Sequence, residues 1–226
     1  IIQNSISPIP LHKTLVLIDK LEELKDIQFW DHQRIALAKQ IVYSYSNLHF
    51  GPEVGVNRNK KNDIPVVQLW IKKKKKMVQD IEQIRHLDIV PTYVYLTDSR
   101  NIGETLQKGS INAVITSPPY PNEKDYTRTT RLESVLLGFI KNKTDLRYYK
   151  QGLLRSNTRN VYKTDTDENW VANNQRINEL SEKIEAKRKE LGKTSGFEKL
   201  YHRVVKLYFG GMAKHLEELK PKLCHG

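Results

Sequence analysis

The chain has 226 residues, of which 38% are hydrophobic and 28% charged, a globular composition long enough to bury a core. Its 38 Lys and Arg residues against 26 Asp and Glu residues give a formal charge of +12, which favours a polyanionic partner such as nucleic acid or an anionic membrane surface. The single cysteine, Cys224, excludes an intrachain disulfide framework, and the seven scattered histidines predict no metal site. Because the sequence shows neither an apolar run of about 18 residues nor a signal peptide, we expect a cytoplasmic protein without a membrane partner.

Residues 1–90 are predicted to form a helical, basic region. Apolar residues recur at helical spacing in 11–25, 30–47 and 66–87, and Asp31 is placed to cap the second of these helices. Residues 49–65 are rich in Gly, Pro and Asn, which predicts an extended loop. The third helix carries Lys72 to Lys76, a run that is either a solvated face or a phosphate-contacting one.

Residues 91–140 are predicted to form a strand, helix, strand core. The segments 92–97 and 111–116 are rich in β-branched and aromatic residues and predict buried strands, with a short helix closed by Gly109 between them. This order is typical of α/β proteins, in which ligands bind beyond the carboxyl ends of the strands. Asp98 and the residues after Thr116 therefore lie where a site is expected.

The rest of the chain is predicted to divide into residues 141–196, a polar excursion followed by a charged helix, and residues 197–226, a core helix. The polar part, 142–170, is long enough to indicate a functional loop or insertion. The core helix is predicted over 197–219, where Gly210 and Gly211 allow close packing or a bend.

The motif TSPPY, which follows the second predicted strand, carries the most specific chemistry. Pro118 and Pro119 fix successive φ angles and make the turn stiff. The Ser117 hydroxyl and the Pro118 carbonyl can accept both N–H groups of an exocyclic amine, while Tyr120 stacks on the attached ring. Such orientation aims the nitrogen lone pair at an electrophilic methyl group, and a base must leave the duplex to reach the site. The alternative is a proline-stiffened turn with a packed tyrosine.

TSPPY resembles the signature [Asp/Asn/Ser]-Pro-Pro-[Tyr/Phe/Trp] of the DNA methyltransferases that modify exocyclic amines with S-adenosylmethionine. The serine variant is more similar to the cytosine-N4 group than to the adenine-N6 group. GPEVGV, VITSPPYPNEKDYTRTTRLESVLLGF and LRSNTRNVY are also similar to one bacterial and archaeal branch, over roughly residues 5–226. The resemblance implies double-stranded DNA as partner, S-adenosylmethionine as cofactor, and a restriction-modification setting that allows a cognate endonuclease as a further partner.

By this resemblance, the catalytic residues are Ser117, Pro118, Pro119 and Tyr120. Asp98 would approach the adenine of the cofactor, although it could equally cap the following helix. Basic and polar side chains that would contact DNA phosphates or base edges are Lys124, Arg128, Thr129, Arg131, Arg155, Asn157, Arg159 and Asn160. A solvated loop is the alternative for this last group.

The sequence departs from the family pattern at the cofactor loop. It contains no acidic-Pro-Phe-x-Gly-x-Gly motif, and the acid that binds the cofactor ribose would fall near Ser5. The expected fold is therefore α/β, a partial Rossmann-like class I methyltransferase sheet with a helical insertion, incomplete at both ends. We expect residues 1–226 alone to bind S-adenosylmethionine poorly and to turn over slowly. Adenine-N6 methylation, RNA methylation and a nucleic-acid-binding module without catalysis remain alternatives.

Overall fold

The computed structural model describes all residues except 1, 52–53, 89, 122–123 and 225–226. The chain divides into two compact units. Unit 1 comprises Ile1–Pro91 and Tyr126–Leu146, and unit 2 comprises Thr92–Asp125 and Arg147–Gly226.

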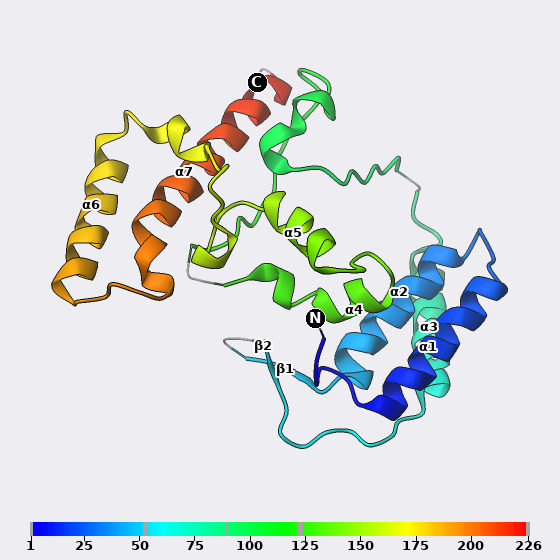
Figure 1. The fold of residues 1–226 in the computed structure, drawn as a ribbon. Helices are drawn as coiled ribbons and strands as arrows, with labels where there is room; N and C mark the ends of the chain where they lie inside the picture. The colour runs from blue at the N-terminus through cyan, green and yellow to red at the C-terminus, as the bar shows by residue number, and fades with distance from the viewer. Residues whose placement is uncertain (1, 52–53, 89, 122–123, 225–226) are drawn as a thin grey trace. The chain divides into compact units, whose positions relative to one another are not determined.

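Unit 1 is built on three helices that confirm the predicted helical region (Figure 1). They are α1 (Pro8–Glu23), α2 (Trp30–Gln40), which continues into a π-helical turn at Ile41–Tyr45, and α3 (Val66–Ile84). Their apolar faces form a common core that includes Leu37, Tyr45 and Trp70. The Tyr45 hydroxyl donates to the Val66 carbonyl at 2.7 Å, so the phenol oxygen is satisfied where it is buried.

Two details of unit 1 correct the sequence prediction. Asp31 does not cap α2, because Phe29 precedes the helix and Asp31 lies in its first turn. The predicted loop 49–65 overlaps an antiparallel hairpin of β1 (Leu48–Phe50) and β2 (Val54–Val56). Strands of three residues are too short for apolar alternation to show in the sequence.

The second segment of unit 1 contains α4 (Arg131–Leu136). Leu132 on α4 belongs to the unit 1 core, with 1% of its surface exposed. An Arg34 Nη2 atom donates to the Leu137 carbonyl at 2.9 Å, at the end of α4. This segment is therefore tied to the helical core by packing and by a hydrogen bond.

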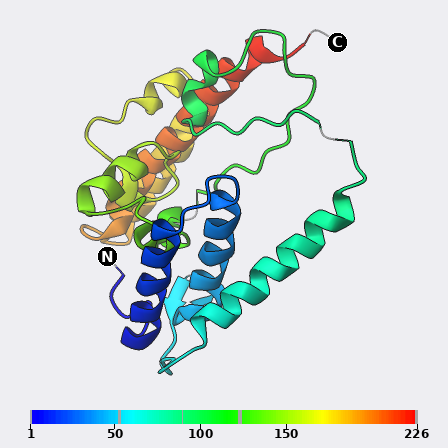
Figure 2. The ribbon, with the colours of Figure 1, turned by 90° about the vertical axis from the view of Figure 1, so that its right-hand side faces the viewer.

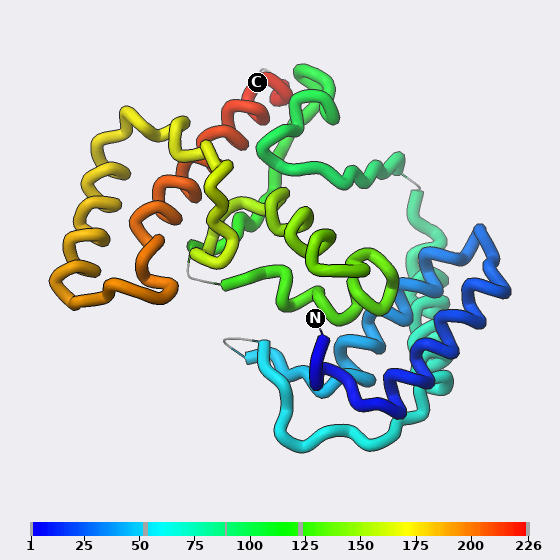
Figure 3. The backbone as a smooth tube through the Cα atoms, in the orientation of Figure 1, coloured from blue at the N-terminus to red at the C-terminus, as the bar shows by residue number. Residues whose placement is uncertain are grey.

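Unit 2 contains most of α5 (Lys143–Gln151), together with α6 (Gln175–Glu190) and α7 (Tyr201–Leu219). Figure 3 shows α6 in gold and α7 in orange to red as neighbours that run in opposite directions. Both helices were predicted, although residues 197–200 form a 3-10 turn before α7. α7 packs against two further 3-10 turns, Ser99–Glu104 and Asp167–Val171.

The two glycines of α7 permit this packing, as the sequence predicted. A Cβ atom on Gly210 would fall on the carbonyl of Asp167, and one on Gly211 would fall on the side chain of Leu154. The close approach of α7 to the turn at Asp167–Val171 therefore requires residues without side chains.

Substitution Gly210→Ala is expected to lower the free energy of unfolding by about 1–3 kcal/mol, since the added methyl group overpacks the contact with Asp167. Urea unfolding followed by circular dichroism measures the change. Gly152→Ala is the matched control, because its Cβ would meet the Tyr149 carbonyl at an ordinary 3.6 Å. Equal stability of the two variants would contradict the close approach.

The predicted strands 92–97 and 111–116 are not formed within the described chain. Residues 92–98 and 113–120 have no regular structure, and the segment between them contains only the 3-10 turn Ser99–Glu104. Ile111 alone makes an isolated parallel bridge, to Leu223. Leu96 and Ile115 are almost fully exposed, at 96% and 101%. Parallel strands are stable only with neighbours on the sheet, and the described residues supply a single bridging position.

The described chain is thus helix-rich with one small antiparallel sheet, and the expected Rossmann-like sheet is not confirmed. The division of the chain into units passes within the segment 91–140, between Asp125 and Tyr126.

Candidate functional site

The TSPPY motif lies on an exposed, irregular segment of unit 2. Ser117 is exposed, Pro118 and Pro119 are half-buried, and Tyr120 exposes 63% of its surface. The four predicted catalytic residues are therefore accessible to a planar ligand. They follow an irregular segment and not, as predicted, the end of a strand.

Residues 124 and 125, which follow the motif in the sequence, are held in place by buried polar groups. The Asn157 side-chain amide, fully buried, donates to the Lys124 carbonyl at 3.0 Å, and the Ser156 hydroxyl donates to the same oxygen at 3.4 Å. The next residue, Asp125, forms an ion pair with Lys150 at 2.6 Å between Nζ and Oδ2. We call these five residues the 124–125 anchor. It holds residues 124 and 125 against the segment 150–157 of unit 2.

Arg155 is buried and paired inside unit 2. Its guanidinium donates to the Asp165 carboxylate at 2.7 and 2.9 Å, in a bidentate arrangement. The two side chains expose only 3% and 6% of their surface. Arg155 also donates to the carbonyls of Lys150 and Gln151, each at 3.1 Å. All of these partners are protein groups, so Arg155 joins the end of α5 to Asp165.

The other predicted DNA contacts in unit 2 divide by exposure. Asn157 and Asn160 are buried, with 0% and 1% of their surface exposed, whereas Lys124 and Arg159 are exposed. A buried amide does not reach a groove of DNA without local rearrangement. Only the exposed pair is directly accessible to a ligand in this conformation.

The predicted contacts in unit 1 are partly engaged by the protein. An Arg128 Nη2 atom donates to the Val54 carbonyl at 3.1 Å, and an Arg131 Nη2 atom donates to the Thr127 hydroxyl at 3.0 Å. Thr129 is exposed, and its hydroxyl donates to the Tyr126 carbonyl at 2.7 Å. These three residues lie in unit 1, whereas the five others lie in unit 2. DNA contact by either group remains a prediction.

Asp98 caps the 3-10 turn Ser99–Glu104. Capping was one of the two roles predicted for it from the sequence. Its Oδ1 accepts from the backbone N–H of Arg100 at 3.0 Å, and its Oδ2 pairs with Arg100 Nη2 at 2.6 Å. Burial of the carboxylate acts to raise the pKa of Asp98, but hydrogen bonds from Arg100 outweigh it and hold the pKa below its usual value. Arg100 also pairs with Asp167 at 2.5 Å. A cofactor amine would have to share a carboxylate already bound to Arg100.

Sequence reasoning missed the acids that pair with the basic excursion, namely Asp125, Asp165 and Asp167. A signal is present for one of the pairs, because Asp165 lies ten residues from Arg155 in the same polar stretch, whereas Asp125 and Asp167 pair with Lys150 and Arg100 across 25 and 67 residues. Opposite charges in one long loop indicate internal ion pairs as much as a ligand surface.

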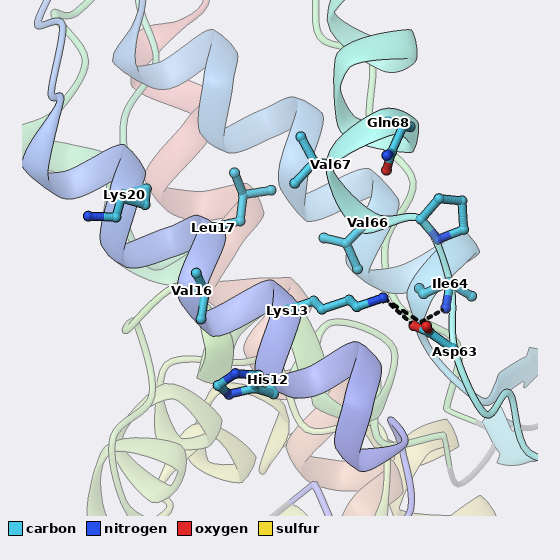
Figure 4. Close-up of a pocket in the computed structure, with 11 residues that line it drawn as sticks. His12, Lys13, Val16, Leu17, Lys20, Asp63, Ile64, Val66, Val67 and Gln68 are labelled. Carbon is cyan, nitrogen blue, oxygen red and sulfur yellow. Dashed lines mark hydrogen bonds and ion pairs between the residues drawn. The ribbon is translucent and has the colours of Figure 1, made fainter.

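Unit 1 contains a separate cavity of about 840 Å³ between α1 and the start of α3 (Figure 4). Apolar side chains such as Val16 and Val67 line it, and Lys13 pairs with Asp63 at 2.6 Å beside them. Both charged side chains are about half exposed and neutralise each other. The cavity therefore offers apolar contact but no pair of groups poised for acid–base chemistry.

Among the residues that the structure describes, no group of three or more His, Cys, Asp and Glu side chains could hold a metal ion. None of the helices in the described ranges is long and apolar enough to cross a membrane.

No known protein family, curated protein or solved structure matches this chain.

Proposed function

We propose that this chain acts on DNA as part of an S-adenosylmethionine-dependent methyltransferase that modifies an exocyclic amine, the N4 amine of a flipped cytosine. The observation that carries the proposal is the Ser117-Pro118-Pro119-Tyr120 turn, whose Ser117 and Tyr120 side chains are exposed on unit 2. A stiff turn with two acceptor oxygens and an accessible ring fits a planar base that carries an amine.

Each residue of the turn has a separate role in this proposal. The Ser117 hydroxyl and the Pro118 carbonyl accept the two N–H groups of the amine and thereby orient its lone pair. Pro119 fixes the backbone between these acceptors and the ring of Tyr120, which stacks on the flipped base.

The proposal assigns no complete site for S-adenosylmethionine to the residues that the structure describes. The Asp98 carboxylate is bound by Arg100, and the sequence contains no acidic-Pro-Phe-x-Gly-x-Gly loop. The chemistry proposed for these residues is therefore limited to holding and orienting the acceptor base.

The proposal includes a Rossmann-like α/β sheet in which 92–97 and 111–116 become strands once neighbouring strands are present. The bridge at Ile111 supports it: the Ile111 N–H donates to the Lys222 carbonyl and the Cys224 N–H donates to the Ile111 carbonyl, both at 2.9 Å. This is the hydrogen-bond pattern of a parallel pair, and α7 lies in the connection, as in a β, α, β crossover. The exposed Leu96 and Ile115 side chains would be buried by such a sheet.

The test is methyl transfer from tritium-labelled S-adenosylmethionine to unmethylated genomic DNA, followed by digestion to nucleosides and chromatography. Because the cofactor loop is missing, we expect weak transfer that requires cofactor in large excess. Label found in N4-methylcytosine supports the proposal. Label found in N6-methyladenine would show that the modified amine belongs to adenine and not to cytosine. DNA binding with no labelled nucleoside would instead favour a binding module without catalysis.

A further inference from the structure

Helix α3 has one face that consists only of lysine and glutamine side chains. Every side chain on this face is exposed, and the spacing of three to four residues places them in one stripe along the helix. We call it the donor face; its members are Gln68, Lys72, Lys75, Lys76, Gln79 and Gln83. These side chains offer N–H donors over about 22 Å of helix, at 1.5 Å per residue.

The orientation of the donor face is fixed by the opposite side of the helix. Val66 and Trp70 are buried, with 1% and 9% of their surface exposed, and Trp70 Nε1 donates to the Gln33 carbonyl of α2 at 3.2 Å. These contacts prevent α3 from rotating about its axis. Figure 2 shows the later turns of α3 running away from α1 and α2, consistent with the exposure of Ile81 and Ile84.

The positive charge on this face is largely uncompensated. Lys76 pairs with Asp80 at 2.9 Å, but Lys72 and Lys75 form no ion pair with any acid in the described part of the chain. Unit 1 as a whole carries 18 Lys and Arg residues against 12 Asp and Glu residues. Like charges three to four residues apart repel one another on a helix, and a bound polyanion relieves this repulsion.

We propose that the donor face of α3 binds the phosphate backbone of duplex DNA. Lysine and glutamine side chains are common donors to phosphate and sugar oxygens, which carry no sequence information. The contact should therefore be insensitive to sequence and strongly dependent on salt. It goes beyond the proposed reaction, because it needs neither the TSPPY turn nor a cofactor.

An anionic membrane is disfavoured as the occupant by the separation of the two faces. Membrane-surface helices bury an apolar face in the lipid, with basic residues beside it. In α3, Val66 and Trp70 are already packed in the core of unit 1, and the exposed apolar side chains, such as Ile71, Val78 and Ile81, lie outside the donor face. The donor face itself has no apolar side chain to insert.

The test is fluorescence anisotropy with a labelled DNA duplex of about 25 base pairs, titrated between about 50 and 200 mM salt without cofactor. In the triple variant Lys72→Gln, Lys75→Gln, Lys76→Gln, we expect the slope of log K against log salt to become shallower by about 2.7, or about 0.9 per lost phosphate contact. Affinity at about 0.1 M salt should fall by tens- to hundreds-fold.

The matched control removes the same number of lysines from α6, by Lys183→Gln, Lys187→Gln, Lys189→Gln. These three lysines lie on α6 in unit 2, outside the donor face, so the slope should stay near that of the wild type. Circular dichroism checks that both variants keep their helices. An unchanged slope in the α3 variant, or an equal change in the control, would overturn the proposal. The proposal would also be overturned if the α3 variant lost its binding to phosphatidylserine-containing vesicles but kept its binding to DNA.

Because the titration contains no cofactor, its outcome is independent of whether the protein transfers a methyl group.

Discussion

Replacing Arg155 with alanine is expected to lower the free energy of unfolding by about 3–5 kcal/mol. Asp165 would keep its buried position, with 6% of its side chain exposed, but would lose the guanidinium that neutralises it. An unpaired buried carboxylate carries a large desolvation cost, which explains the size of the effect. Urea unfolding of the wild type and the variant at neutral pH measures it.

Arg159→Ala is the matched control, because Arg159 lies four residues away, was also predicted to contact DNA, and is exposed. We expect its stability to change by no more than about 0.5 kcal/mol. The double variant Arg155→Met, Asp165→Leu should recover most of the loss, since apolar side chains often replace a buried ion pair without cost. An Arg155→Ala protein of normal stability with weakened DNA binding would contradict the internal pair.

Replacing Ser117 with alanine is expected to slow methyl transfer about 10²-fold or more, since it removes one acceptor that orients the amine. Tyr120→Ala removes a stacking contact of about 1–3 kcal/mol, which corresponds to roughly 5- to 150-fold weaker binding of the flipped base. Tyr120→Phe should stay within a few-fold of the wild type, because it keeps the ring. Tritium transfer to genomic DNA measures all three.

Both positions are exposed, so these substitutions should leave the unfolding midpoint nearly unchanged. Tyr148→Ala is the control for loss of an exposed ring, since Tyr148 exposes 74% of its surface and is not part of the motif. A Tyr120→Ala protein that transfers methyl groups as fast as the Tyr148→Ala protein would show that no base stacks on Tyr120.

The helices could be predicted from the sequence because their signal is local. In α7, for example, Val204 and Leu207 lie at helical spacing, and the structure buries both. Gly210 and Gly211 were also informative, because few arrangements other than close packing or a bend use adjacent glycines in an amphipathic helix.

The strands could not be predicted from local sequence in the same way, because a parallel strand depends on neighbouring strands that its own sequence does not encode. Ile111 finds one bridging partner in Leu223, whereas Ile115 finds none among the described residues and is fully exposed. The burial of the candidate site residues could not be predicted either. Arg155 and Arg159 lie in similar sequence surroundings, but in the fold Arg155 is buried and paired with Asp165, whereas Arg159 is exposed.

The central claim is that a flipped cytosine stacks on Tyr120. It is tested most directly by photocrosslinking, which needs no cofactor. DNA in which 5-iodocytosine replaces cytosine is irradiated with the protein, and the crosslinked peptide is identified by mass spectrometry. We predict a crosslink at Tyr120 that disappears in the Tyr120→Ala variant; crosslinks confined to other exposed rings, such as Tyr148 or Trp170, would contradict the account.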